Sequence, residues 1–115
     1  MSLIVPCAWN CDGDTEDLVY ELVVKTFELM DVIPEKTVYV NVEFEPAEEM
    51  DGALGWCFDQ DLEGSGEIQI LVSDALLQDR HELRRTIVHE TIHATQLVRG
   101  IPMCEEEAYE YEDKV

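Results

Sequence analysis

Positive charge is scarce in this chain. Only 7 of its 115 residues are Lys or Arg, against 27 Asp and Glu, so the formal net charge is −20 at pH 7. A surface of this kind repels phosphate groups and anionic lipids over most of its area. We therefore expect no nucleic-acid partner and no membrane partner.

Long apolar runs and paired cysteine motifs are also missing. No stretch approaches the roughly 18 apolar residues that cross a bilayer, and the first ten residues, MSLIVPCAWN, lack the basic start and long apolar run of a signal peptide. The cysteines match neither a Cys-x-x-Cys zinc motif nor a dense disulfide framework; they are Cys7, Cys11, Cys57 and Cys104. These absences predict a cytoplasmic protein with free thiols.

The chain has the material for one small α+β domain over residues 1–115. Apolar residues at helical spacing predict an N-terminal helix that begins near Asp14 and ends before Pro34. Alternation of Val with polar residues predicts a strand over 36–45, and residues 53–60 and 66–73 predict two more strands joined by a glycine-containing turn. We expect a small, mostly antiparallel sheet of three strands.

The second half of the chain has a helical pattern. From Ser73 onward, apolar residues recur near helical spacing until Gly100 and Pro102 stop the helix, and a short glutamate-rich helix is expected within residues 103–114. Four of the seven cations and all three histidines lie between residues 80 and 99. Any chemistry is therefore expected on this long helix.

The sequence HETIH, residues 89–93, is the strongest functional signal. On a helix, His89 and His93 stand one turn apart on the same face, so both imidazoles can approach one ion. Glu90, beside the first histidine, takes the general-base position of His-Glu-x-x-His metallopeptidases. One pentapeptide thus predicts two metal ligands and a base.

A catalytic zinc site needs a third protein ligand and one open position. No histidine follows His93, and His81 lies about 12 Å upstream along a continuous helix, too far to share the ion. The third ligand is therefore expected among the last residues of the chain, which offer Cys104, Glu105, Glu106, Glu107, Glu110, Glu112 and Asp113.

HETIHATQ followed by PMCEEEAYEYE resembles the gluzincin metallopeptidases, a group of zincins whose third ligand is a glutamate on the next helix, commonly in a Glu-x-x-Ala pattern. Glu105 and Ala108 match that pattern, so the resemblance implies zinc held by His89, His93 and Glu105. A tight antiparallel helix pair would instead bring Glu107 or Glu110 level with His93, and Glu107 is the second choice.

Residues 52–96 are similar to the SprT-like metalloproteases, which place a Gly-aromatic strand, an Ile-rich strand and a helix before the His-Glu-x-x-His helix. The chain departs from them in lacking a downstream histidine ligand and in being strongly acidic, which argues against DNA-linked substrates. In such folds the strand nearest the site, here expected to be residues 66–72, offers its edge to an extended peptide.

These observations predict a minimal zincin that hydrolyses peptide bonds of a peptide or protein substrate, with Glu90 as general base toward a metal-activated water. Tyr109, Tyr111 and Arg99 are the candidates for stabilising the oxyanion, although such residues more often serve packing or lie at the surface. The alternative is a non-catalytic acidic interaction protein or nucleic-acid mimic, in which zinc only braces a small core.

Overall fold

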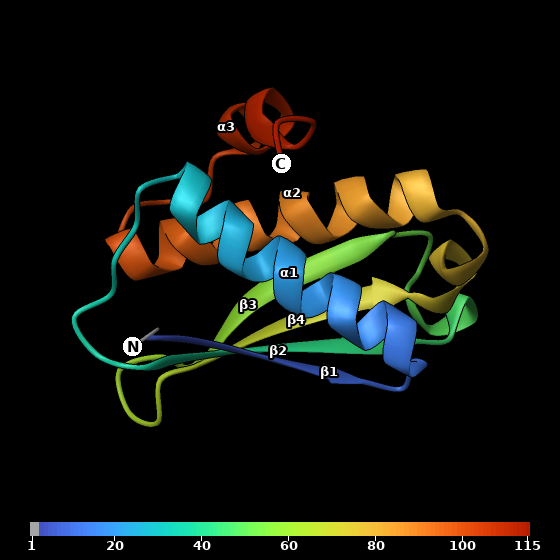
Figure 1. Cartoon of the computed structure of the whole chain (residues 1–115), viewed down its shortest axis with the longest axis horizontal. Helices are drawn as coiled ribbons and strands as arrows, with labels where there is room; N and C mark the ends of the chain where they lie inside the picture. Colours follow the sequence, from blue (N-terminus) through green and yellow to red (C-terminus); the bar gives the residue numbers. More distant parts are fainter. Residues whose placement is uncertain (1–2) are drawn as a thin grey trace.

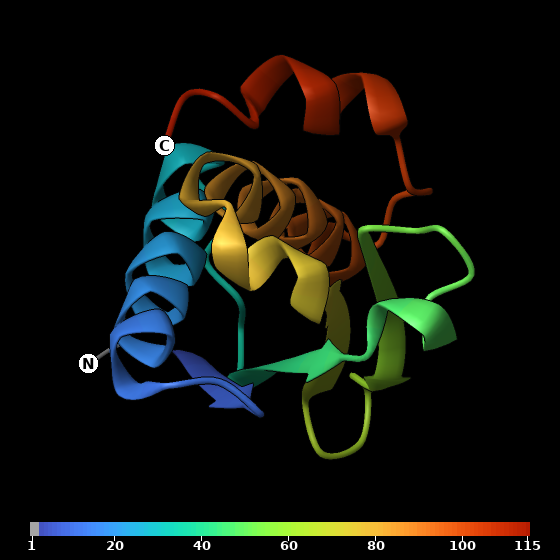
Figure 2. The ribbon, with the colours of Figure 1, turned by 90° about the vertical axis from the view of Figure 1, so that its right-hand side faces the viewer.

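A computed structural model describes residues 3–115. Its helices and strands follow in the order β1 (Ile4–Trp9), α1 (Gly13–Leu29), β2 (Val38–Glu45), η1 (Ala47–Glu49), β3 (Gly55–Asp61), β4 (Glu67–Ser73), η2 (Asp74–Gln78), α2 (Arg80–Arg99) and α3 (Glu105–Tyr111). The two long helices lie on one face of a single sheet, and α3 packs on α2 (Figures 1 and 2).

The sheet has four strands in the order β1-β2-β4-β3. Strand β2 pairs in parallel with both β1 and β4, and only β3 pairs antiparallel, with β4. The α+β class agrees with the sequence, but the expected three-stranded, mostly antiparallel sheet is wrong. The hairpin expected between residues 53–60 and 66–73 is confirmed as the β3–β4 pair.

The strand that sequence reasoning missed is β1, with the sequence IVPCAW. Pro6 carries no backbone N–H for a ladder, and a proline inside an apolar run argues against a central strand. Strand β1 lies at the edge of the sheet, where this loss is tolerated, and its parallel pairing with β2 across the intervening α1 leaves no local turn signal.

The sheet order also corrects the strand expected to receive a peptide. The expected strand, residues 66–72, corresponds to β4 (Glu67–Ser73). This strand lies between β2 and β3, so both of its edges are paired. The edge strand on this side of the sheet is β3. This strand also contacts α2 more extensively than β4 does.

Helix boundaries follow local capping. The Oδ1 of Asp12 accepts a hydrogen bond of 2.8 Å from the N–H of Thr15, so α1 starts at Gly13, one residue before the predicted Asp14. Residues 73–99 do not form one helix. The short helix η2 ends at Gln78, and the side chain of the next residue, Asp79, caps α2 by accepting from the N–H of Glu82. Gly100 ends α2 in the left-handed conformation, with φ 72°.

The core fills the space between the sheet and the two long helices. Every second residue of β2 and β4 points into it, and so do apolar residues of α1 and α2 such as Leu22 and Ile87. The described residues contain no helix that is both long and apolar enough to cross a membrane.

Candidate metal centre

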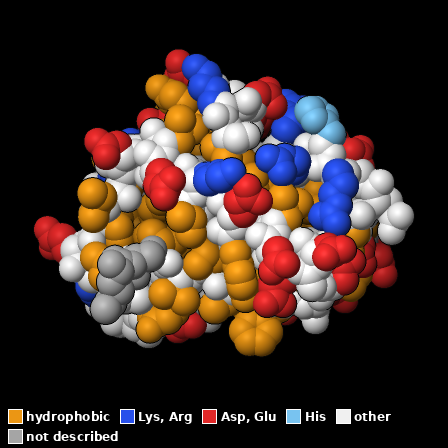
Figure 3. Space-filling model, viewed as in Figure 1, with side chains coloured by type: hydrophobic (Ala, Val, Ile, Leu, Met, Phe, Trp, Pro, Cys, Tyr) orange, Lys and Arg blue, Asp and Glu red, His pale blue; other side chains and the backbone are white. Residues whose placement is uncertain are grey.

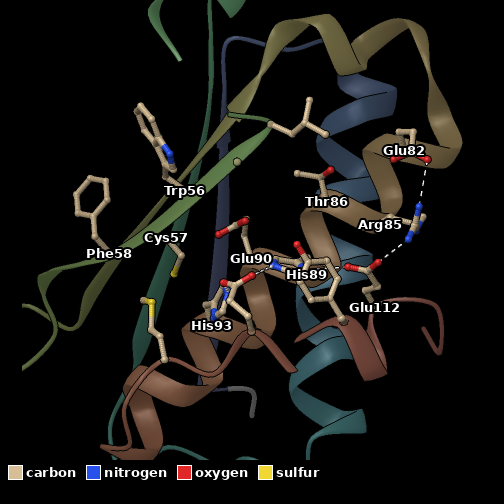
Figure 4. A pocket seen from close by; sticks show the side chains of 15 residues that line it. Trp56, Cys57, Phe58, Glu82, Arg85, Thr86, His89, Glu90, His93 and Glu112 are labelled. Carbon is tan, nitrogen blue, oxygen red and sulfur yellow. Dashed lines mark hydrogen bonds and ion pairs between the residues drawn. The ribbon is translucent and has the colours of Figure 1, made fainter. Parts of the chain in front are cut away.

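Helix α2 presents two imidazoles next to one another. Its buried side includes Leu83, Ile87 and Ile92, which fix the helix against the core, and this orientation turns His89 and His93 toward a cleft (Figure 4). The two rings meet edge to face with centroids 5.0 Å apart, and His93 is only 3% exposed. Because of the predicted one-turn spacing, the two rings lie side by side at the same part of the cleft.

Glu105, the first residue of α3, brings its carboxylate to the same point. Its Oε1 lies 2.6 Å from the Nε2 of His93, and its Oε2 lies 3.2 Å from the Nε2 of His89. One ligand atom from each residue lies within 4.8 Å of the others. The third residue of the predicted ligand set is therefore within reach of both histidines.

The outer nitrogen of each histidine has its own partner. The Nδ1 of His89 lies 2.7 Å from the Oε2 of Glu112, and the Nδ1 of His93 lies 2.8 Å from the Oε1 of Gln96. Both partners can accept a hydrogen bond, so a histidine that binds a metal through Nε2 would donate its Nδ1–H to this partner. Outer partners of this kind orient metal-bound histidines in proteins.

Gln96 also holds the start of α3 in place. Its Oε1 accepts from the N–H of Cys104, and its Nε2 donates to the backbone oxygen of Cys104 and to the Oε1 of Glu107, each at 3.0 Å. These contacts fix which end of the amide faces His93. A single buried side chain thus positions both His93 and the residue before Glu105.

Glu112 links the far end of α3 to α2. This carboxylate is buried, and besides His89 it binds the Nη2 of Arg85 at 2.5 Å. Arg85 also pairs with Glu82 at 3.2 Å. The negative charge beside His89 is therefore balanced by a guanidinium, which offsets the cost of burying it.

The cluster fits a divalent metal ion. With each Nδ1 protonated, two imidazole lone pairs and an anionic carboxylate converge, and only a proton or a cation placed between them makes this arrangement favourable. Tetrahedral ligands at about 2.1 Å from zinc lie about 3.4 Å apart. The contact of 3.2 Å suits that spacing, whereas the contact of 2.6 Å has to lengthen by a small shift of the exposed Glu105 side chain.

Glu90 lies beside the cluster and points toward β3 (Figure 4). It is 7% exposed, and burial raises the pKa of its carboxyl, with Glu105 raising that pKa further and the two histidines opposing the shift. A carboxylate in such a position binds a proton more readily than one in water. Its placement suits the predicted general base.

Gly55 makes this placement possible. A Cβ atom at residue 55 would lie 2.8 Å from the Cγ of Glu90 and 2.9 Å from the Cγ2 of Thr86, closer than real side chains approach. The absence of a side chain lets β3 run against α2 at the level of the cluster. This role of a glycine was not predicted from the sequence.

The cluster opens into a cleft of about 720 Å³ between α2, α3 and β3. Leu54, Cys57, Met103 and Tyr109 line it with apolar side chains, whereas the rings of Trp56 and Phe58 on β3 point away from the cluster (Figure 4). The ring of Tyr109 packs edge to face on His89 with centroids 4.8 Å apart. The cleft therefore combines a polar floor that could hold a metal ion with apolar side chains in its wall.

The other residues considered from the sequence lie elsewhere. Glu107, the second choice for third ligand, forms an ion pair with Arg99 and accepts from Gln96 instead of facing the histidines. The Tyr111 ring is covered by Lys114, and His81 is exposed at the start of α2. Of the three oxyanion candidates, Tyr109 alone lines the described cleft.

The supporting residues could be found only in part from the sequence. Gln96 follows His93 by three residues, the spacing that lets helix side chains touch. Its role could not be predicted from this spacing alone, because it also depends on where α3 lies. Glu112 was considered as a ligand and not as a partner of His89. No family model, no curated protein and no solved structure matches the chain.

Proposed function

We propose that this chain is a zinc-dependent metallopeptidase, with His89, His93 and Glu105 as zinc ligands and Glu90 as general base. The observation that carries the proposal is the convergence of two Nε2 atoms and one carboxylate, with each Nδ1 held by a separate acceptor. Two histidines and one glutamate are a known ligand set of catalytic zinc, and three protein ligands leave a position open.

The chemistry divides between the metal and the chain. A zinc ion in this place would supply Lewis acidity, which polarises a carbonyl and acidifies water. Glu90, with its raised pKa, accepts a proton from the attacking water and passes it to the leaving amine. Gln96 and Glu112 keep the imidazoles in the orientation that points Nε2 at the cluster.

The cleft geometry supports an extended peptide substrate. Strand β3 has a free edge beside the cleft, and an added peptide strand can pair with such an edge through backbone hydrogen bonds. Tyr109, at the cleft wall over His89, is the group we assign to the oxyanion. Free Cys7, Cys11, Cys57 and Cys104 suit a reducing compartment such as the cytoplasm.

Glu90→Gln tests this mechanism, since it removes the base and keeps the size of the side chain. We expect unchanged zinc content and melting temperature, and a loss of about 10²-fold to 10⁴-fold in hydrolysis of a quenched fluorescent peptide library. Glu110→Gln, an exposed change on α3, is the matched control and keeps full activity. Equal hydrolysis by the Glu90→Gln variant and the wild type would overturn the mechanism.

The second candidate is an acidic interaction protein in which zinc braces α3 against α2. The excess of 27 acidic residues over 7 basic ones favours it. Under this function, zinc-loaded protein hydrolyses no peptide in the library, and Glu90→Gln leaves partner binding unchanged.

A further inference from the structure

The face of the sheet opposite the helices is uncovered in the part of the chain that the structure describes (Figure 2). Sheets with parallel strands normally have both faces covered, because their side chains are apolar on both sides. Here β1, β2 and β4 pair in parallel, and α1 and α2 cover only one side. We call the other side the outer face.

The strand register places aromatic rings in rows across this face. Trp9, Glu43, Leu71 and Trp56 are successive register partners across all four strands, so they form one row with a tryptophan at each end. Trp9 is 56% exposed and Trp56 is 41% exposed. Two large, partly exposed rings thus stand at the ends of a row whose middle holds Glu43 and Leu71.

The next two rows each add one exposed ring. Phe58 is the β3 partner of Gln69 and is 44% exposed, whereas Tyr39 pairs with Glu67 across β2 and β4 and is 40% exposed. The outer face therefore carries four exposed rings together with Glu43 and Glu67, and the row between these two carboxylates contains Asn41 and Gln69. Aromatic faces attract Lys and Arg side chains, and nearby carboxylates strengthen that attraction.

No ion pair among residues 3–115 neutralises Glu43 or Glu67, and Glu67 accepts hydrogen bonds only from the Asn41 amide and the Ser65 hydroxyl among the described side chains. The four strands contain no Lys or Arg, and every ion pair among the described residues joins side chains of α1, α2, α3 or the residues just after α3. Most Lys and Arg side chains visible in Figure 3 lie over the two long helices. Lys36, just before β2, donates to the backbone oxygen of Glu63.

We infer that the outer face binds a basic polypeptide segment, with Arg or Lys side chains lying over Trp9, Trp56, Phe58 and Tyr39 and pairing with Glu43 and Glu67. A second copy of the chain is a poorer occupant, because two copies of charge −20 would bring like carboxylates together. The helices and the metal cluster lie on the other side of the sheet, so this binding does not depend on the proposed hydrolysis.

The probe for this surface is a 12-residue peptide of alternating Arg and Ser, compared with a Glu and Ser peptide of the same length. The only two tryptophans of the chain, Trp9 and Trp56, both lie on the outer face, so the Arg peptide is expected to change intrinsic fluorescence. The Glu peptide is expected to leave it unchanged. Both titrations use the Glu90→Gln variant in EDTA, which separates binding from any metal chemistry.

Two double variants of equal charge locate the binding. Glu43→Gln with Glu67→Gln is expected to weaken the Arg peptide about fivefold or more, whereas Asp17→Asn with Glu28→Gln, on the exposed side of α1, changes it less than about twofold. Trp9→Ala is expected to cost about threefold. Trp9 lies on β1, at the sheet edge opposite β3, so this loss distinguishes the outer face from the cleft.

Three results would each overturn the inference. They are an absence of Arg-peptide binding, an equal loss in the two double variants, which indicates diffuse attraction to net charge, and a dimer in sedimentation experiments that Trp9→Ala dissociates.

Discussion

At the scale of single residues, the metal cluster depends on side chains outside it. Gln96 and Glu112 leave each histidine only one nitrogen for a metal, and Gln96 also holds the backbone just before Glu105. The positions of the proposed ligands are therefore set by contacts within the chain. Prior positioning of this kind raises affinity, because less order has to be created on binding.

Replacing each of the two candidate glutamates by alanine, in separate variants, tests which one is the third ligand. Glu105→Ala is expected to remove most of the roughly one zinc per chain, because it deletes the carboxylate that faces both histidines. Glu107→Ala is expected to keep the zinc, because Glu107 binds Arg99 and Gln96. Elemental mass spectrometry on untagged protein measures both. Zinc lost with Glu107→Ala and kept with Glu105→Ala would reassign the ligand.

Gln96→Met removes the partner of His93 while keeping nearly the same volume. We expect zinc affinity to fall about tenfold to a hundredfold, because the His93 ring and the start of α3 both lose their fixed orientation. Competition with a chromogenic chelator measures the change. The matched control is Gln69→Met on the outer face of β4, which is expected to leave zinc affinity as it was.

The sequence predicted the candidate site best at the scale of single residues. The four-residue spacing of His89 and His93 is a local property of a helix, and the structure brings Glu105 to both rings. Gln96, Glu112 and Gly55 act across elements that are distant in the chain, so their roles depend on a packing arrangement that local patterns do not encode. The metal itself stays a prediction.

At the scale of elements, the contact between β3 and α2 determines the shape of the site. Strand β3 passes so close to the helix at Gly55 that no side chain fits there. The same strand supplies the cleft wall and the free edge of the sheet. Its distance from α2 therefore controls both the width of the cleft and the surroundings of Glu90.

Gly55→Ala is expected to separate these two elements. The added methyl group would meet Glu90 and Thr86, so we expect a loss of about 1–3 kcal/mol in the free energy of unfolding and reduced hydrolysis. Urea unfolding of the metal-free protein measures the first effect. Gly13→Ala, where a Cβ meets nothing within 4 Å, is the control and should be neutral or slightly stabilising. Equal stability of the two variants would contradict the close approach.

Elements were harder to predict than residues. The strands with clear alternation, β2 and β4, and the local β3–β4 hairpin follow from the sequence. Strand β1 is short and contains Pro6, and the parallel pairs join segments that are about 30 residues apart. Short-range patterns say nothing about such pairs, which is why the expected sheet was too small and had the wrong strand direction.

At the scale of the whole molecule, the net charge of −20 acts on stability. Ion pairs among the described residues are few beside the number of carboxylates, and they gather on the helical side. Repulsion among the remaining carboxylates opposes the compact state. Dissolved salt shortens the range of this repulsion, to about 10 Å at 0.1 M and about 3 Å at 1 M.

Raising KCl from 0.02 M to 0.5 M is therefore expected to raise the melting temperature of the metal-free protein by a few degrees. Circular dichroism in EDTA measures the transition, and EDTA keeps metal binding out of the comparison. A variant with several exposed α1 carboxylates changed to Gln should show a smaller salt effect. A melting temperature that falls with salt would show that attractive pairs outweigh the repulsion.

The sheet order also has a consequence for how the chain folds. Residues 55–99 form the β3–β4 hairpin and the helix that packs on it, so their contacts are close in sequence and form quickly. Strand β1 must instead find β2 across the intervening helix, which requires closing a longer loop. We expect the hairpin and α2 to form the folding nucleus, with β1 joining late. Both histidines would then be in place before the N-terminal strand docks.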